Sequence, residues 1–198
     1  WAVKKRANNR FYAGITPLED PLSTSGDFGA LPNEYGFLTD GKKANDGVES
    51  NYGSSIAVGE SVVIAYDRNA GKLYFGKWDG SRLSWFGNSN PATDANPAFS
   101  GIDTSKEWAP TFARRTGAAN FTAQFEGFGF NLPSGFNQLD PYRTDQITSR
   151  MLRARPAIVY LNSRDCMDFN LSKDRLSAVS GSGNARLRAT RFIGGKRI

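Results

Sequence analysis

One pair of apolar segments joined by a glycine-containing turn constrains the fold of this chain more than any other feature. Residues 62–66 are apolar, residues 67–71 read Asp-Arg-Asn-Ala-Gly, and a second, largely apolar segment covers residues 73–77 and ends in Lys77. Asn69 and Gly71 are residue types that tolerate the positive φ of such a turn. The pattern predicts an antiparallel β-hairpin, closed by Asp79-Gly80, and favours an all-β protein.

Further strands are predicted on both sides of this hairpin. Upstream, two segments within residues 1–15 are joined by a hairpin turn at Asn8-Asn9, and a strand over residues 35–38 is followed by a return strand ending at Asp46-Gly47. Downstream, strands over residues 109–114 and 120–125 are separated by a Thr116-Gly117 turn. Phe121, Ala123 and Phe125 alternate with polar residues, which predicts one buried and one wet face. The chain is rich in Phe (14) and Gly (21), which suits short strands and tight turns.

Two stretches are predicted as surface loops because they lack periodicity and contain helix and strand breakers. Residues 17–33 are rich in Pro, Ser, Gly and Asp, and residues 86–101 contain two Asn-Pro steps. The fold class that follows is a two-sheet antiparallel, jelly-roll-like sandwich.

The charge of the chain is divided unevenly. Residues 1–140 hold 13 Lys and Arg against 15 Asp and Glu, a net charge of −2, and residues 141–198 hold 12 against 4, a net charge of +8. We therefore expect a sandwich domain over residues 1–140 and a basic C-terminal arm over residues 141–198. Within the arm, residues 143–155 are compatible with a helix that Pro156 ends, residues 157–161 predict a strand, and residues 166–171 suit another.

Several function classes lose support from the sequence. The chain has no His and a single cysteine, Cys166, so the usual Cys/His metal sites, an internal disulfide and His-dependent triads have no basis, and we expect no cofactor. No pair of carboxylates alternates along one strand face, as a glycosidase on such a sandwich would need. No apolar run is long enough for a membrane helix. Because Trp1 rather than Met opens the first strand, we expect the chain to be part of something longer.

The central third resembles the SPRY domain family, a sandwich related in architecture to the concanavalin lectins. The segment that carries the resemblance is "YGSSIAVGESVVIAYDRNAGKLYFGKWDG", residues 52–80. Upstream, Trp1, "AGI" and "EYGFLTDG" are similar to the opening strands of the family, and downstream "EWAPTF" and "ANFTAQF" are similar to its closing strands. The resemblance covers residues 1–139 and implies a non-enzymatic binding module.

A narrower resemblance lies within this one. Residues 71–102, "GKLYFGKWDGSRLSWFGNSNPATDANPAFSGI", and residues 128–140, "FGFNLPSGFNQLD", resemble the SPRY variant found in virion proteins of tailed bacteriophages and prophages. The resemblance ends after Asp140. It implies a structural or binding component of a phage particle, located in the virion as a tail, fibre or capsid-surface protein.

Candidate binding residues gather around residues 78–94. The aromatic residues Trp78, Trp85, Phe86 and Trp108 suit a platform for a glycan or a peptide, although Trp108 is expected in the core and Trp85 is as readily core as platform. Polar specificity would come from Arg82, Asn88, Asn90 and Asp94, for which a solvated loop is the alternative. The partner would be a host surface receptor or glycan.

The arginines of the arm have three readings: docking on neighbouring subunits, contact with nucleic acid, and a solvated surface. They are Arg150, Arg153, Arg155, Arg186, Arg188, Arg191 and Arg197. Alternating apolar and basic residues over 185–193 suit a strand added to a neighbour's sheet edge. Because no nucleic-acid recognition motif accompanies the charges, we favour other virion subunits, as a homo-oligomer within a symmetric assembly, over nucleic acid. A soluble lectin-like or peptide-binding adaptor is the alternative function.

Overall fold

The computed structural model describes residues 1–20, 28–116, 119–138, 161–167, 169–171, 177–180 and 186–189, with side chains for 1–20, 28–115 and 119–138. In this part of the chain the elements are strands and two short 3₁₀ helices, η1 (Phe86–Asn88) and η2 (Pro91–Thr93). All strand pairs are antiparallel and form two sheets. The predicted fold class, an all-β two-sheet sandwich, is confirmed.

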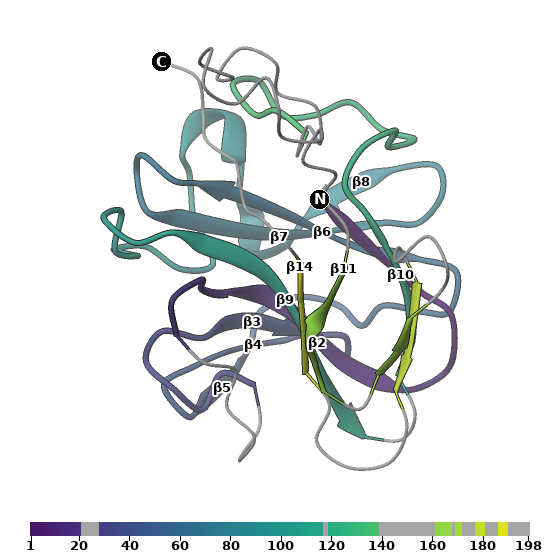
Figure 1. Cartoon of the computed structure of the whole chain (residues 1–198). Helices are drawn as coiled ribbons and strands as arrows, with labels where there is room; N and C mark the ends of the chain where they lie inside the picture. The colour runs from purple at the N-terminus through teal and green to yellow at the C-terminus, as the bar shows by residue number, and fades with distance from the viewer. Residues whose placement is uncertain are drawn as a thin grey trace, which may run out of the picture.

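Among the described residues each sheet has seven strands, of which five come from residues 1–124. The first sheet has the order β12 (Phe169–Leu171), β13 (Ser177–Ser180), β10 (Asn120–Gln124), β1 (Ala2–Lys5), β6 (Ser61–Asp67), β7 (Lys72–Trp78) and β8 (Leu83–Trp85). The second has the order β11 (Leu161–Met167), β14 (Arg186–Ala189), β9 (Trp108–Thr116), β2 (Arg10–Pro17), β3 (Tyr35–Leu38), β4 (Lys42–Asn45) and β5 (Val48–Asn51). Figure 1 shows β6 and β7 in the upper layer and β2, β3 and β4 in the lower one.

The central hairpin has the predicted register, since β6 and β7 pair from Ser61 with Trp78 to Asp67 with Lys72. The Asp67 Oδ1 accepts hydrogen bonds from the backbone N–H groups of Asn69 and Ala70 in the turn, at 3.0 Å each. Gly71 has a φ of 59°, and a Cβ there would lie 2.3 Å from the Ile102 carbonyl oxygen. The turn therefore needs glycine at this position for both conformation and space.

The predicted hairpin around Asn8-Asn9 is wrong. The two strands exist, but β1 pairs with β6 and β10 in the first sheet, and β2 pairs with β3 and β9 in the second. The consecutive strands β9 and β10 likewise lie in different sheets. A turn sequence marks where the chain reverses but not which strand becomes the partner, and here both connections cross between the layers.

The main core lies between the sheets and is built from aromatic rings that meet across it. Phe121 of the first sheet packs on Phe11 and Phe112 of the second, with ring centroids 5.2 and 5.1 Å apart. Phe37 and Phe75 form a similar pair at 5.5 Å. All five side chains are fully buried, and burying a ring of this size stabilises the fold by about 1.5–3 kcal/mol. The alternation predicted for residues 121–125 is thus confirmed.

A smaller cluster covers the outer face of the second sheet. Phe28, from the segment predicted as a surface loop, packs on Tyr12 with ring centroids 5.7 Å apart. A Cβ at Gly36 would lie 2.3 Å from the Phe28 ring, so β3 can accept the ring because it has glycine there. At least this end of the predicted loop belongs to a core, and residues 21–27 lie outside the described residues.

The segment 86–101 is a connection, as predicted, but it closes one end of the core rather than lying wholly outside. Phe86 is buried and stacks on Phe37 with centroids 5.0 Å apart. Lys43 of β4 holds the far part of the segment, because its Nζ donates to the Ala98 carbonyl at 2.7 Å and lies 5.1 Å from the Phe99 ring. The two Asn-Pro steps prevent a strand but not packing.

Strands from the predicted arm extend both sheets of the same chain. β13 pairs with β10, where Ser177 faces Thr122, and β14 pairs with β9, where Leu187 faces Phe112. Of the predicted strand 157–161 only Leu161 is described, and it begins β11. The predicted helix 143–155 lies outside the described residues, and the domain boundary at residue 140 stays a prediction.

Candidate binding site

A shallow pocket of about 640 Å³ opens at one end of the first sheet, where β7 ends and β8 begins. It is formed by two segments that are distant in the sequence. Its lining residues are Trp78, Ser81, Arg82, Leu83, Phe128, Gly129, Phe130 and Asn131. The volume lies within the usual range of about 300–1,000 Å³ for small-molecule sites.

The rim formed by Ser81 and Arg82 is held by the carboxylate of Asp79. The Asp79 Oδ1 accepts from the Arg82 and Ser81 backbone N–H groups at 2.8 Å each, and from the Ser81 hydroxyl at 2.9 Å. Gly80 completes the turn with a φ of 104°. The hydrogen bond from the Arg82 backbone N–H, followed in size of effect by those from Ser81, favours the ionised carboxylate. Together they lower the pKa of Asp79 to about 2. The turn is therefore fixed at neutral pH.

Another part of the lining, called here the aromatic wall, consists of Trp78, Phe128 and Phe130. Trp78 and Phe130 pack with ring centroids 5.3 Å apart and planes at 51°, and Phe128 stacks on Phe130 at 5.1 Å and 18°. These three side chains are half-buried, so they combine fixed positions with exposed area. Phe128 and Phe130 follow β10 after a turn in which the Gln124 amide donates to the Gly127 carbonyl at 2.7 Å.

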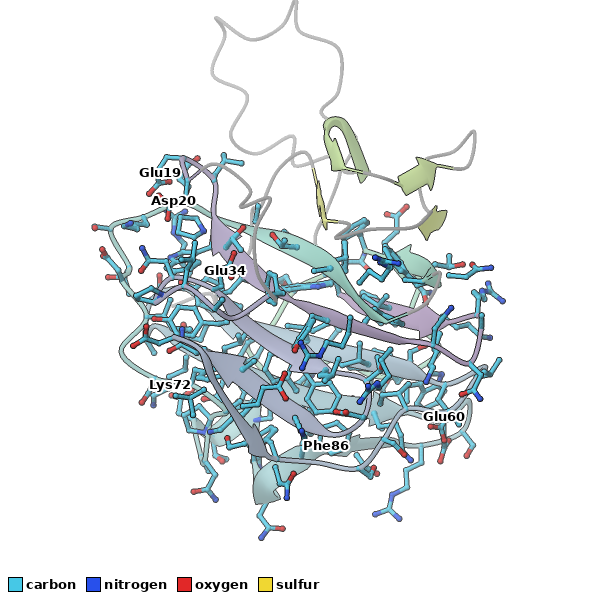
Figure 2. The ribbon with its side chains drawn as sticks, turned by 90° about the horizontal axis from the view of Figure 1, so that it is seen from below. Glu19, Asp20, Glu34, Glu60, Lys72 and Phe86 are labelled. Carbon is cyan, nitrogen blue, oxygen red and sulfur yellow. The ribbon has the colours of Figure 1, made fainter. Side chains whose placement is uncertain are left out.

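The charge of the site comes from Arg82, which is exposed and is the charged member among the described lining residues. No ion pair links the Arg82 guanidinium to another described residue. Nearby on β7, Lys77 forms an ion pair with Glu60 at 3.4 Å. Figure 2 shows Glu60 and Lys72 at opposite ends of the molecule. The pocket lies at the Glu60 end of the β6–β7 hairpin, because its lining residue Trp78 pairs with Ser61, the residue after Glu60. Arg82 is thus the cationic group of the described lining, and the ionised Asp79 carboxylate lies in the same turn.

Two of the six predicted binding residues, Trp78 and Arg82, line this pocket together. Trp85 lies on β8 but is not among the lining residues, and its ring packs where a Cβ of Gly76 would be. Of the other aromatic candidates, Trp108 is 1% exposed and Phe86 is 7% exposed, so both are core residues.

Asn88, Asn90 and Asp94 do not line this pocket and instead form local turns. The Asn90 side chain caps η2 by accepting from the Ala92 N–H at 3.0 Å. Asn88 and Asp94 have φ values of 54° and 58°, a conformation that Asn and Asp tolerate better than most residues. Their types are therefore explained by the path of the loop.

Phe128, Phe130 and Asn131 were missed as site residues. They follow the last strand predicted for the sandwich, and nothing in the periodicity of the segment tells which part of the sheet it will cover. The alternation of Phe128, Gly129 and Phe130 was the available signal, since residues two apart can present their rings to the same surface.

Of the arm arginines, Arg186 and Arg188 lie in β14, opposite Ala113 and Thr111 of β9. The strand predicted over 185–193 is therefore confirmed for Arg186–Ala189. Its described neighbours, β9 and β11, belong to the same chain, so β14 does not offer a free edge to a second subunit here. Arg150, Arg153, Arg155, Arg191 and Arg197 lie outside the described residues.

Other kinds of site find no support in the described part of the chain. No three His, Cys, Asp or Glu residues gather there as metal ligands would. Among the same residues, no helix combines the length and apolar character needed to cross a membrane. The chain matches no protein-family model, and a search of curated proteins finds no match either.

Proposed function

We propose that this chain is a non-enzymatic structural and binding component of a bacteriophage particle, such as a tail, fibre or capsid-surface protein. The proposal starts from the resemblance of residues 71–102 and 128–140 to SPRY variants in phage virion proteins. The two-sheet sandwich agrees with that resemblance. In this function the sandwich is a rigid support, and one end of it presents a binding surface.

The observation that carries the proposal is the contact between these two segments. Trp78 of the first packs on Phe130 of the second, and Tyr74 meets Phe136 edge-on at 6.3 Å. Together the segments supply every described lining residue of the pocket. Residues that resemble one class of protein thus converge on one concave surface, which is the arrangement expected of a binding function.

One carboxylate of the second sheet, Glu49 of β5, has surroundings that suit a structural role. Glu49 accepts from the Tyr12 hydroxyl and from Lys42 at 3.2 Å, and it pairs with Arg115 at 3.6 Å. Burial raises the pKa of Glu49, but the hydrogen bonds from Tyr12 and Lys42 outweigh it, and the pKa falls below its ordinary value. Such a carboxylate stays ionised and paired, which suits a structural ion cluster better than a proton donor.

A second candidate, a soluble lectin-like or peptide-binding adaptor, is favoured by the pocket itself. Its aromatic wall and polar rim would serve a free module as well as one fixed in a particle. The two functions differ in assembly: a virion component forms a symmetric oligomer, and an adaptor binds its ligand as a monomer. We assign the assembly contact to the basic arm because its net charge of +8 suits acidic neighbouring subunits.

The test compares the full chain with a variant in which Arg150, Arg153, Arg155, Arg191 and Arg197 are changed to glutamine. Substitution is preferable to deletion, because strands of the same region pair with β9 and β10. We expect the wild type to form a defined oligomer in sedimentation experiments and to be detected in purified particles, and the variant to be monomeric and absent from them. A wild type that stays monomeric and is missing from particles would refute the proposal and leave the adaptor.

A further inference from the structure

We propose that the pocket between Trp78 and Phe130 binds an acidic saccharide, a sugar unit that carries a carboxylate or another anionic substituent. This inference names the ligand class for the surface described above and so rests on the proposed binding function. Three features of the pocket favour this ligand: the aromatic wall, the polar rim with Arg82, and the short strand at the pocket's edge.

The aromatic wall suits the apolar face of a sugar ring. A pyranose presents C–H groups on its faces and hydroxyls at its rim, so it packs flat on an aromatic ring and forms hydrogen bonds at its edge. Phe128 and Phe130 are stacked, with their ring planes at 18° to each other, and the Trp78 ring is inclined to that of Phe130 at 51°. The three half-buried rings thus form an angled floor rather than a closed apolar cavity, and an open floor leaves sugar hydroxyls in contact with water.

The polar rim supplies donors at the edge of that floor. Arg82 and Asn131 carry a guanidinium and an amide that can donate to hydroxyls and carboxylates, while the Ser81 hydroxyl donates to Asp79 at 2.9 Å and offers an acceptor to the ligand. Asp79 fixes the backbone beneath Ser81 and Arg82, so part of the ordering cost of binding is already met. The rim is thus pre-organised for a polar ligand.

The Arg82 guanidinium is the group that can pair with an anionic ligand, and the ionised Asp79 carboxylate in the same turn offsets part of its charge. The Arg82 guanidinium is exposed and forms no ion pair with the described residues. Glu60, which could compete for a nearby cation, is engaged by Lys77 at 3.4 Å and by the Ala57 N–H at 2.7 Å. A planar guanidinium forms paired hydrogen bonds with a carboxylate, and such charge-assisted bonds are about twice as strong as neutral ones.

A peptide fits the same surface less well. One way for a peptide to bind the end of a sheet is to add a strand to an exposed edge, where its affinity comes from main-chain hydrogen bonds. β8, which lies beside the pocket, is the last strand of its sheet in the described part of the chain, but it is three residues long. An edge this short offers few backbone partners, so the side-chain surface of the pocket would dominate recognition.

The experiment measures binding of matched acidic and neutral oligosaccharides to the full chain, on a glycan array and then by calorimetry with sialyllactose and lactose as probes. We expect saturable binding of acidic glycans with a preference over their neutral counterparts. Arg82→Gln should weaken acidic binding by about tenfold and leave neutral binding unchanged. Trp78→Ala should abolish both.

Arg68→Gln is the matched control, because it removes a cation from the turn at the other end of the same hairpin, and it should bind as the wild type does. Circular dichroism and the thermal midpoint confirm folding of each variant. Absence of saturable glycan binding by the wild type, acidic binding unaffected by Arg82→Gln, or preferential binding of peptides would overturn the proposal. A wild type that binds acidic glycans but is absent from purified particles would instead refute the proposed place in the virion.

Discussion

The indole of Trp78 and the ring of Phe130 lie with their centroids 5.3 Å apart, and this contact joins the end of β7 to the segment that follows β10. The wall of the pocket is therefore a tertiary contact and not a property of either segment alone. Any change that frees residues 128–131 from the sheet should remove the pocket without unfolding the sandwich.

Replacing Phe130 with alanine tests this contact. We expect the free energy of unfolding to fall, with a coupling between Trp78 and Phe130 of about 0.5–1.5 kcal/mol in a double-mutant cycle with Trp78→Leu. Urea unfolding supplies the four values. Leu132→Ala, in the same segment and 36% exposed, is the control and should change stability by less than about 0.5 kcal/mol. A coupling of zero would mean that the two rings do not support each other in solution.

Phe121 tests the main core. Its ring packs on Phe11 and Phe112 from the opposite sheet and is fully buried, so Phe121→Ala leaves a cavity between the sheets. We expect a loss of about 3–5 kcal/mol in the free energy of unfolding, measured by chemical denaturation. Val58→Ala, at a side chain that is 53% exposed, should cost less than about 0.5 kcal/mol. Equal effects of the two substitutions would contradict the sandwich arrangement.

Local sequence patterns were sufficient for most strands but not for their partners. Residues 62–66 and 73–77 predict a hairpin because both strands and their turn are contiguous, and the structure has it. Asn8-Asn9 has equally good turn chemistry, yet its flanking strands separate into two sheets. The choice depends on burial of Phe11 and Phe121 against each other, which is a long-range contact that no window of the sequence contains.

Only part of the candidate site could be predicted, because the rest of it depends on a long-range contact as well. Trp78 and Arg82 are close in sequence to a turn, where exposed functional residues are common, so they could be proposed directly. Phe130 joins them through tertiary packing alone. Asn90 and Asp94 looked equally suitable as polar ligands, but the loop uses them for a cap and for a left-handed residue. Residue type does not distinguish these uses.

Lys43 tests how the segment 86–101 is fixed to the core. Its Nζ donates to the Ala98 carbonyl at 2.7 Å and lies 5.1 Å from the rings of Tyr52 and Phe99, while burial lowers its pKa. Lys43→Met keeps the stem and removes the cation, so we expect a loss of about 1–2 kcal/mol in unfolding free energy and faster amide exchange near Ala98.

Lys42→Met is the matched control for that substitution. Lys42 is the neighbour on β4, with a side chain that is 40% exposed and an ion pair to Glu49 at 3.2 Å. A pair this exposed contributes less than about 1 kcal/mol, and its loss should leave amide exchange in the segment 86–101 unchanged. If both substitutions alter exchange at Ala98 alike, the effect arises from β4 and not from the contact of Lys43 with the segment.

The stability that the Asp79 hydrogen bonds give to the pocket rim depends on pH. The hydrogen bonds that Asp79 accepts from Arg82 and Ser81 lower its pKa in the folded chain to about 2, from an ordinary value of 3.8. Because the folded pKa is the lower one, the stabilisation is complete above about pH 4 and is lost as the pH falls toward 2. We expect Asp79→Ala to be less stable than the wild type at pH 6, and the difference to shrink between pH 4 and pH 2. Chemical denaturation across this range measures it.

Asp79→Asn separates charge from geometry, because its amide oxygen can still accept from the Ser81 and Arg82 backbone N–H groups. We expect its stability to lie between those of Asp79→Ala and the wild type at pH 6 and to vary less with pH than that of the wild type. A direct check is the carboxyl carbon resonance of Asp79, which should titrate well below that of an unperturbed aspartate. Titration near 4 would mean that the turn opens in solution, and the rim that positions Arg82 would then not be pre-organised.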